Sequence, residues 1–140
     1  MSLTVVLYVL TALAAVVVVL TRARMGRGQG AGRVYVGARL LDVHTGAGTL
    51  AIIAWLVFLI APKDTMAGGS AVGILAIGLW VVTTIAGLLI LVRWLPSRGK
   101  HASEGRQDRW SDGPGLSVLA HVGLLVGVAV FFYAYVNGKG

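Results

Sequence analysis

Four long apolar segments dominate this 140-residue sequence and limit what it can fold into. They cover about residues 3–20, 37–61, 70–95 and 115–136. A helix rises about 1.5 Å per residue, so each segment is about long enough to cross a hydrocarbon core of about 30 Å. Backbone groups find no partners in lipid, and segments of this length satisfy them as helices rather than as barrel strands. We therefore predict an all-α integral membrane protein, a four-transmembrane-helix bundle that forms one domain over residues 1–140.

The composition supports this class and excludes several kinds of site. Hydrophobic residues make up 57% of the chain and charged residues only 12%, whereas soluble domains keep about a quarter of their residues charged. There is no cysteine, which excludes disulfides, zinc–thiolate sites, iron–sulfur ligation and thiol nucleophiles. No Ser/His/Asp arrangement or phosphate-binding loop is present, and we expect no catalytic residues and no catalytic activity of the chain's own.

The basic residues predict the orientation of the helices. Ten of the twelve lysines and arginines lie in or beside two connecting segments, at about residues 21–36 and 96–114. Because cytoplasmic loops carry the excess of lysine and arginine, both segments are predicted to be cytoplasmic loops and both termini extracytoplasmic. The net charge of +7 is thereby explained by topology, and no nucleic-acid partner is expected. A composition rich in Val, Ala, Gly and Arg is typical of GC-rich bacteria, so we expect a multi-pass protein of the bacterial cytoplasmic (inner) membrane.

Small and weakly polar residues predict which faces point into the bundle. Membrane helices associate through such residues, which allow close packing and modest hydrogen bonds. In the first helix they form one stripe, at Thr4, Tyr8, Thr11 and Ala15. In the second they lie near one face, at Gly37, His44, Ala47, Gly48 and Ala51. These Gly- and Ala-rich faces are expected to pack within the bundle, against other membrane subunits, or against a second copy of the chain.

Two histidines lie inside the apolar segments. His44 and His121 are each four or five residues past the cytoplasmic start of an apolar run, roughly 6 to 8 Å below the inner interface. Their helices run in the same direction, so the two side chains are at matching depth. Ionisable groups inside a membrane are costly and are by default functional.

The pair is suited to hold a b-type haem, with one neutral imidazole on each side of the iron. Arg39, Arg106 and Arg109 could then pair with the haem propionates at the cytoplasmic edge. With its two histidines and the glycines near them, the chain resembles the membrane cytochromes b, including the b561-like four-helix bundles. That resemblance implies paired histidines on two parallel helices that hold a haem. Those families usually carry two haems and four ligands, so a chain with one intramembrane pair would be a single-haem member.

Other interpretations of the same residues stay open. The histidines could be interfacial polar groups, with Asp42 and Arg39 close enough to join a polar cluster. A quinone pocket near His44, Trp55 or Trp80 is a further alternative. His101, Glu104 and Asp108 share the second basic loop without a recognisable ligand spacing, so a solvated loop is expected there and no metal site beyond the haem iron.

Three functions follow from these features. The first is a small non-catalytic accessory or anchor subunit of a larger bacterial membrane complex, such as a respiratory one. The second is a bis-histidine haem b protein that transfers electrons, linked to quinone. The third is a small transporter subunit, which ranks last because the segments lack a substrate-sized set of polar groups.

Overall fold

The computed structural model describes residues 2–26, 37–94 and 114–138. Over these ranges the chain is all-helical, with helices α1 (Leu3–Gly26), α2 (Ala38–Ile60), α3 (Ser70–Trp94) and α4 (Pro114–Val136). Each contains a stretch long and apolar enough to cross a membrane. The bounds of α2, α3 and α4 differ from the predicted ones by at most one residue at either end. The predicted loops at 21–36 and 96–114 lie largely outside the described residues.

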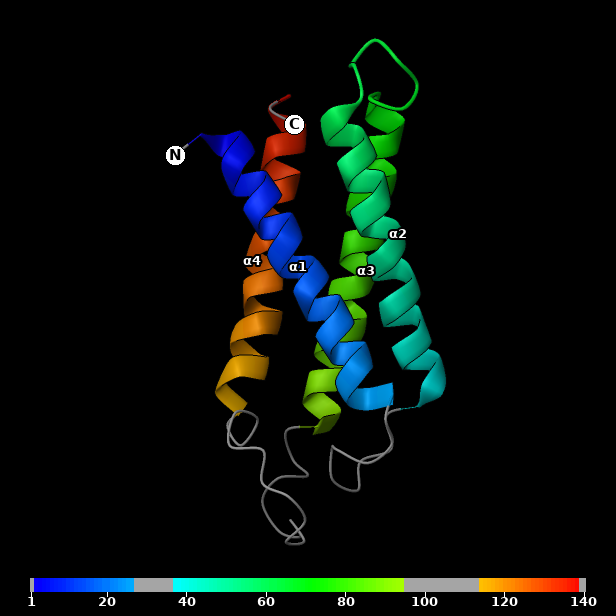
Figure 1. Ribbon diagram of the computed structural model, residues 1–140, viewed down its shortest axis with the longest axis vertical. Helices are drawn as coiled ribbons and strands as arrows, with labels where there is room; N and C mark the ends of the chain where they lie inside the picture. Colours follow the sequence, from blue (N-terminus) through cyan, green and yellow to red (C-terminus); the bar gives the residue numbers. More distant parts are fainter. Residues whose placement is uncertain (1, 27–36, 95–113, 139–140) are drawn as a thin grey trace, which may run out of the picture.

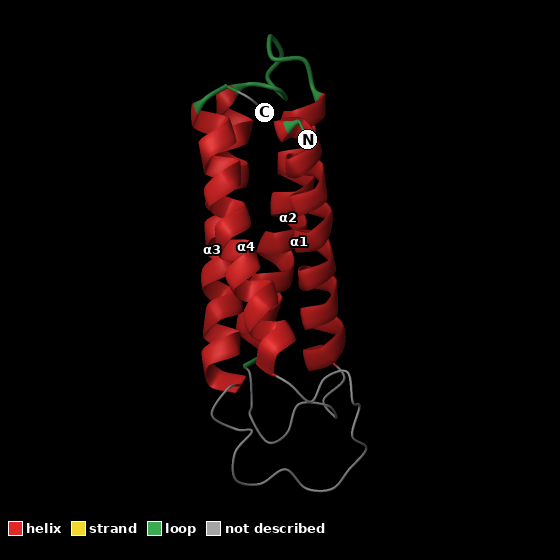
Figure 2. Cartoon of the chain, turned by 90° about the vertical axis from the view of Figure 1, so that its left-hand side faces the viewer, coloured by secondary structure: helices red, strands yellow, loops and turns green. Residues whose placement is uncertain are grey.

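The helices form an up-and-down bundle in which chain neighbours are spatial neighbours (Figure 1). α1 packs on α2, α2 on α3, α3 on α4, and α4 closes the ring against α1. The α2–α3 interface is by far the most extensive, and α3 with α4, and α1 with α2, are also close together in the second view (Figure 2). In this order α2 and α4 are diagonal partners. The two termini lie at the same end as the connection between α2 and α3 (Figure 1).

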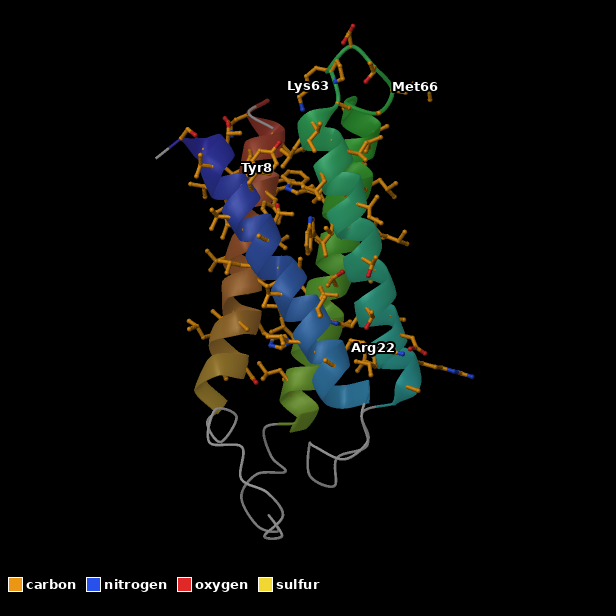
Figure 3. The ribbon with its side chains drawn as sticks, viewed as in Figure 1. Tyr8, Arg22, Lys63 and Met66 are labelled. Carbon is orange, nitrogen blue, oxygen red and sulfur yellow. The ribbon has the colours of Figure 1, made fainter. Side chains whose placement is uncertain are left out.

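Helix α1 is six residues longer than its apolar segment predicts, because it continues to Gly26. The thickness of the lipid core sets the length of the apolar segment, but it does not set where the helix ends. Backbone hydrogen bonding can continue beyond the apolar segment until residues with low helix propensity, such as glycine, weaken it. The extension carries Arg22, whose guanidinium donates to Asp42 of α2 at 2.6 Å. In Figure 3, Arg22 lies at the end of α1 next to the start of α2. Asp42 is therefore paired with Arg22, and the expected partner Arg39 is exposed.

The buried stripe of α1 also differs from the predicted one. Thr11 is buried as expected, but Thr4 and Tyr8 are exposed and Ala15 is half-buried. The observed stripe consists of Leu7, Thr11, Ala14, Val18 and Thr21. A helix that is apolar on every side carries almost no periodic signal, so packing against neighbours decides its rotation. In α2 the predicted His44, Gly48 and Ala51 are buried, while Gly37 and Ala47 are only half-buried.

The connection between α2 and α3 is short and ordered by local contacts. Ala61 leaves the helix with extended backbone, as a residue before proline should. Lys63 then donates to the carbonyl of Phe58 at 2.9 Å, and its ammonium lies 3.8 Å from the centre of the Phe58 ring. Burial lowers the pKa of Lys63 below its usual range. Lys63 and Met66 both belong to this end of the bundle (Figure 3).

The core is divided into two halves of different chemistry. Toward the termini it is aromatic: Phe131 lies 4.8 Å from Trp55 and 5.5 Å from Trp80 between ring centres. Phe58 extends the cluster, 5.4 Å from Trp55 and 5.9 Å from Tyr135. Toward the opposite end, the bundle interior contains the two histidines and aliphatic side chains such as Leu41 and Ile90.

Candidate functional site: the facing histidine pair

His44 and His121 meet in the interior of the bundle. His44 is fully buried and His121 is 7% exposed. Their ring centres are 6.4 Å apart, and the ring planes are inclined by 40°. Because α2 and α4 are diagonal partners, the two imidazoles face each other across the bundle rather than along one interface. The sequence placed them at matching depth; the structure brings them together.

Helix geometry accounts for this meeting. His44 lies six residues after the start of α2 and His121 seven after the start of α4, so each is about 9 to 11 Å from its helix end. In α4, His121 shares the buried face with Leu124, Val128 and Phe131, at the i, i+3, i+7 and i+10 spacing of one helix face. Each histidine is therefore held inward by the same stripe that builds the core.

Among the described residues, the pair makes one hydrogen bond, and three of its ring nitrogens have no partner. His121 Nδ1 is 2.7 Å from the carbonyl oxygen of Ser117, one turn earlier, and must donate to it. In a neutral ring this leaves His121 Nε2 with a lone pair, which is how histidine ligands of metals are commonly oriented. His121 Nε2 and both nitrogens of His44 have no hydrogen-bond partner among the described residues. Buried polar atoms are nearly always paired, so these nitrogens indicate a missing partner.

The nearby hydroxyl groups do not supply that partner. On α3, one turn before Gly87, Thr83 is fully buried and donates to the carbonyl of Leu79 at 2.8 Å. Thr84 donates to the carbonyl of Trp80 at 2.9 Å. Both hydroxyls therefore bond to their own helix, as is common where few other acceptors are available.

Gly87 of α3 forms the wall of the centre. A Cβ atom at this position would stand 3.2 Å from His44 Nε2 and 3.3 Å from His121 Nε2. It would also lie 2.9 Å from Cδ2 of His121. Any larger residue at position 87 would require the imidazoles or α3 to shift, so glycine suits this close approach. Gly87 could not be recognised as a site residue from the sequence, because one glycine among several in an apolar helix carries no signal of what it faces.

The spacing of the rings suits two imidazoles that share one metal. A metal bonded at about 2.0 Å to one nitrogen of each ring places the ring centres about 6.3 Å apart, against the observed 6.4 Å. A bare metal ion would need more ligands. No group of three or more His, Cys, Asp or Glu side chains that could hold one occurs in the described part of the chain.

The space around the histidine pair limits which cofactor can bind there more strictly than the donor atoms do. A macrocycle extends about 4 Å from its iron, so van der Waals contact keeps backbone atoms at least about 7 Å away in its plane. Both Nε2 atoms are within 3.3 Å of the Gly87 Cβ position, so the midpoint between them is less than about 5 Å from the Gly87 Cα. The donor set fits a haem iron, but a macrocycle does not fit while α3 lies this close.

The remaining predicted site residues are only partly described. Arg39 is exposed on the first turn of α2, and Arg106 and Arg109 lie outside the described residues. Trp55 and Trp80, named for a quinone pocket, are fully buried in the aromatic half, and neither indole N–H has a partner within the described ranges. His101, Glu104 and Asp108 also lie outside them.

Comparisons of the chain with protein-family models, curated proteins and solved structures find no match. The resemblance to the membrane cytochromes b therefore stays a prediction from the two histidines. What the pair can do has to follow from its own chemistry.

Proposed function

We propose that this chain is a multi-pass protein of the bacterial cytoplasmic membrane that transfers electrons, and that His44 and His121 would hold the iron of one b-type haem when α3 lies farther from the pair than it does in this structure. The observation that supports the proposal is the facing of two buried imidazoles, 6.4 Å apart between ring centres. When bound, a haem supplies one-electron chemistry. The chain's own contribution is to hold two neutral imidazoles at one depth with their free Nε2 atoms available.

Charge favours a haem over a bare divalent ion in this centre. Of the two acidic residues that the structure describes, Asp42 is exposed and paired with Arg22, and Asp64 is in the connection between α2 and α3. A divalent ion between two neutral imidazoles would therefore be an uncompensated charge in an apolar interior, which costs tens of kcal/mol in the limit of no relaxation. A porphyrin carries two negative charges of its own and brings the iron in nearly neutral form.

The absorption spectrum of the purified protein tests this proposal directly. The chain is expressed in a haem-producing bacterium, purified in mild detergent, and measured oxidised and after reduction with dithionite. We expect a sharp reduced α-band of the b type at about one haem per chain. His44→Ala and His121→Ala should each lose this band, because one axial ligand is removed.

His101→Ala is the matched control, since it removes the third histidine of the chain and leaves His44 and His121 unchanged. It should keep the full absorption band. A featureless spectrum from wild-type protein that is helical by circular dichroism would contradict the proposal, as would equal band loss in all three histidine variants.

The role of accessory or anchor subunit stays a prediction that is compatible with a haem. Every helix exposes large apolar side chains, such as Leu13, Leu50, Ile74 and Phe132, and these could face either lipid or other subunits. Purification after mild solubilisation, followed by identification of chains at constant stoichiometry, would test it.

A further inference from the structure

Two buried nitrogen atoms converge on one point of the bundle interior. The Nε2 atoms of His44 and His121 lie 3.2 and 3.3 Å from the Cβ position of Gly87. Both side chains are more than nine-tenths buried, and neither Nε2 atom has a hydrogen-bond partner among the described residues. The two nitrogens therefore form a donor pair for a single electron-pair acceptor placed between them.

The hydrogen bond of His121 fixes the tautomer and the direction of its ring. Nδ1 donates to the carbonyl oxygen of Ser117 at 2.7 Å, so in the neutral ring the lone pair is on Nε2. Metal-bound histidines commonly hold their other N–H in this way, and the carbonyl makes the ring a better electron donor. His44 offers the same atom when its ring proton is on Nδ1. The donor atoms are thus those of a metal site with two neutral nitrogen ligands.

The number of ligands and the apolar surroundings restrict which ion can bind. Most metal ions would need more than two ligands, and the described part of the chain has no group of three His, Cys, Asp or Glu side chains that could hold one. A monovalent ion with a filled d shell, such as Cu(I) or Ag(I), is the exception, because two nitrogen donors in line satisfy it. The solvation energy lost on burial scales with the square of the charge, so it is roughly a quarter of that for a divalent ion.

The space beside Gly87 admits one such ion. With bonds of about 1.9 Å, two imidazoles in line have ring centres about 6.1 Å apart, close to the observed 6.4 Å. The ion would then lie about 2.6 Å from the Gly87 Cβ position, where glycine carries only a hydrogen atom. A methyl group there would overlap the ion. A single ion, unlike a macrocycle, therefore requires no displacement of α3.

We infer that His44 and His121, with α3 where it lies in this structure, form a two-coordinate site for a monovalent copper ion. The inference goes beyond the proposed function, because it requires no haem. The ion binds as Cu(I), and binding changes no oxidation state. Gly87 determines the specificity of the site, since it leaves room for an ion and not for a larger group.

Competition with a chromophoric Cu(I) chelator tests the inference, with the full chain purified free of haem in detergent and kept anaerobic. We expect wild type to bind one Cu(I) per chain. His44→Ala, His121→Ala and Gly87→Ala should each lose affinity by at least about tenfold. Gly78→Ala is the matched control for Gly87→Ala, because it is on the same helix and its Cβ position has no atom within 4 Å. His101→Ala is the control for the histidines, and both controls should bind as wild type does.

X-ray absorption of copper-loaded wild type keeps the inference testable if a variant does not fold. We expect two nitrogen neighbours at about 1.9 Å and no sulfur neighbour. The three methionines of the chain are the alternative soft donors. Sulfur neighbours, more than two neighbours, or no copper bound by helical wild-type protein would each overturn the inference, as would unchanged affinity in both histidine variants.

The outcomes for copper and for haem are independent. Failure of the haem-free protein to bind Cu(I) has no bearing on whether a reduced α-band appears after expression with haem. Absence of that band from wild type would overturn the proposed function and leave the copper site standing.

Discussion

At the scale of single residues, glycine acts in this bundle through the side chain that it lacks. Gly73 and Gly48 each face side-chain atoms at 2.7 Å from their Cβ positions, whereas Gly46 and Gly78 face open space. The residue type is the same in all four, and only the surroundings differ. The presence of a glycine in an apolar helix therefore does not by itself indicate that close packing requires it.

Gly73→Ala is expected to destabilise the protein by about 1 to 3 kcal/mol, because its methyl group would overlap the rings of Phe58 and Tyr135. Gly78→Ala should be neutral or slightly stabilising, because alanine is the better helix former by up to about 1 kcal/mol. Thermal unfolding in detergent, followed by circular dichroism, measures both. Equal stability of the two variants would show that the α3–α4 contact at Gly73 is not tight.

Among the site residues, the sequence identified the histidines and the structure added their surroundings. His44 and His121 were recognisable because a titratable side chain in an apolar run is rare and costly. Gly87, beside the histidine pair, and Arg22, the partner of Asp42, could not be recognised from the sequence, for a different reason in each case. Gly87 matters only because two rings from other helices reach it, and Arg22 only because α1 continues past its apolar segment beside α2.

At the scale of helices, α4 presents adjacent phenylalanines to opposite environments. Phe131 is fully buried between Trp55 and Trp80, while Phe132 is 55% exposed. The helical repeat turns consecutive side chains by about 100°, so neighbours in sequence belong to different faces. Phe131 and Phe132 therefore allow core packing to be compared with surface contact within one helix.

Phe131→Ala should cost about 3 to 5 kcal/mol, since it leaves a cavity in the centre of the aromatic half. Phe132→Ala removes the same atoms from the outer face and should cost less than about 1 kcal/mol. Unfolding by a denaturing detergent, with the helical signal as the readout, distinguishes them. A cost for Phe132→Ala as large as that for Phe131→Ala would place Phe132 in an interface with another molecule.

At the scale of the whole molecule, the even number of helices in the described part of the chain brings both termini and the α2–α3 connection to one end of the bundle (Figure 1). The basic residues predict that this end is extracytoplasmic. The histidine pair then lies nearer the cytoplasmic side, and the aromatic half of the core nearer the outside. Under the proposed function and this predicted orientation, a donor or acceptor of electrons would reach the pair most directly from the cytoplasmic side.

Cysteine labelling in intact cells tests this orientation against an unlabelled background, because the natural chain has no cysteine. Met66 is 94% exposed in the α2–α3 connection, so Met66→Cys should react with a membrane-impermeant maleimide added outside. Ser103→Cys, in the second basic segment, should react only after the membrane is permeabilised. The reverse pattern would contradict the predicted topology.

The sequence by itself determined the four helices, their approximate bounds and the matching depth of His44 and His121. These properties depend on local quantities, namely hydropathy, helix breakers such as Pro62, and a constant rise per residue. The tertiary structure alone decided which helices are diagonal partners, how each is rotated, and hence that the two imidazoles face each other beside Gly87. Helices that are apolar on every side carry no periodic signal of their neighbours, so side-chain packing between distant segments makes that choice.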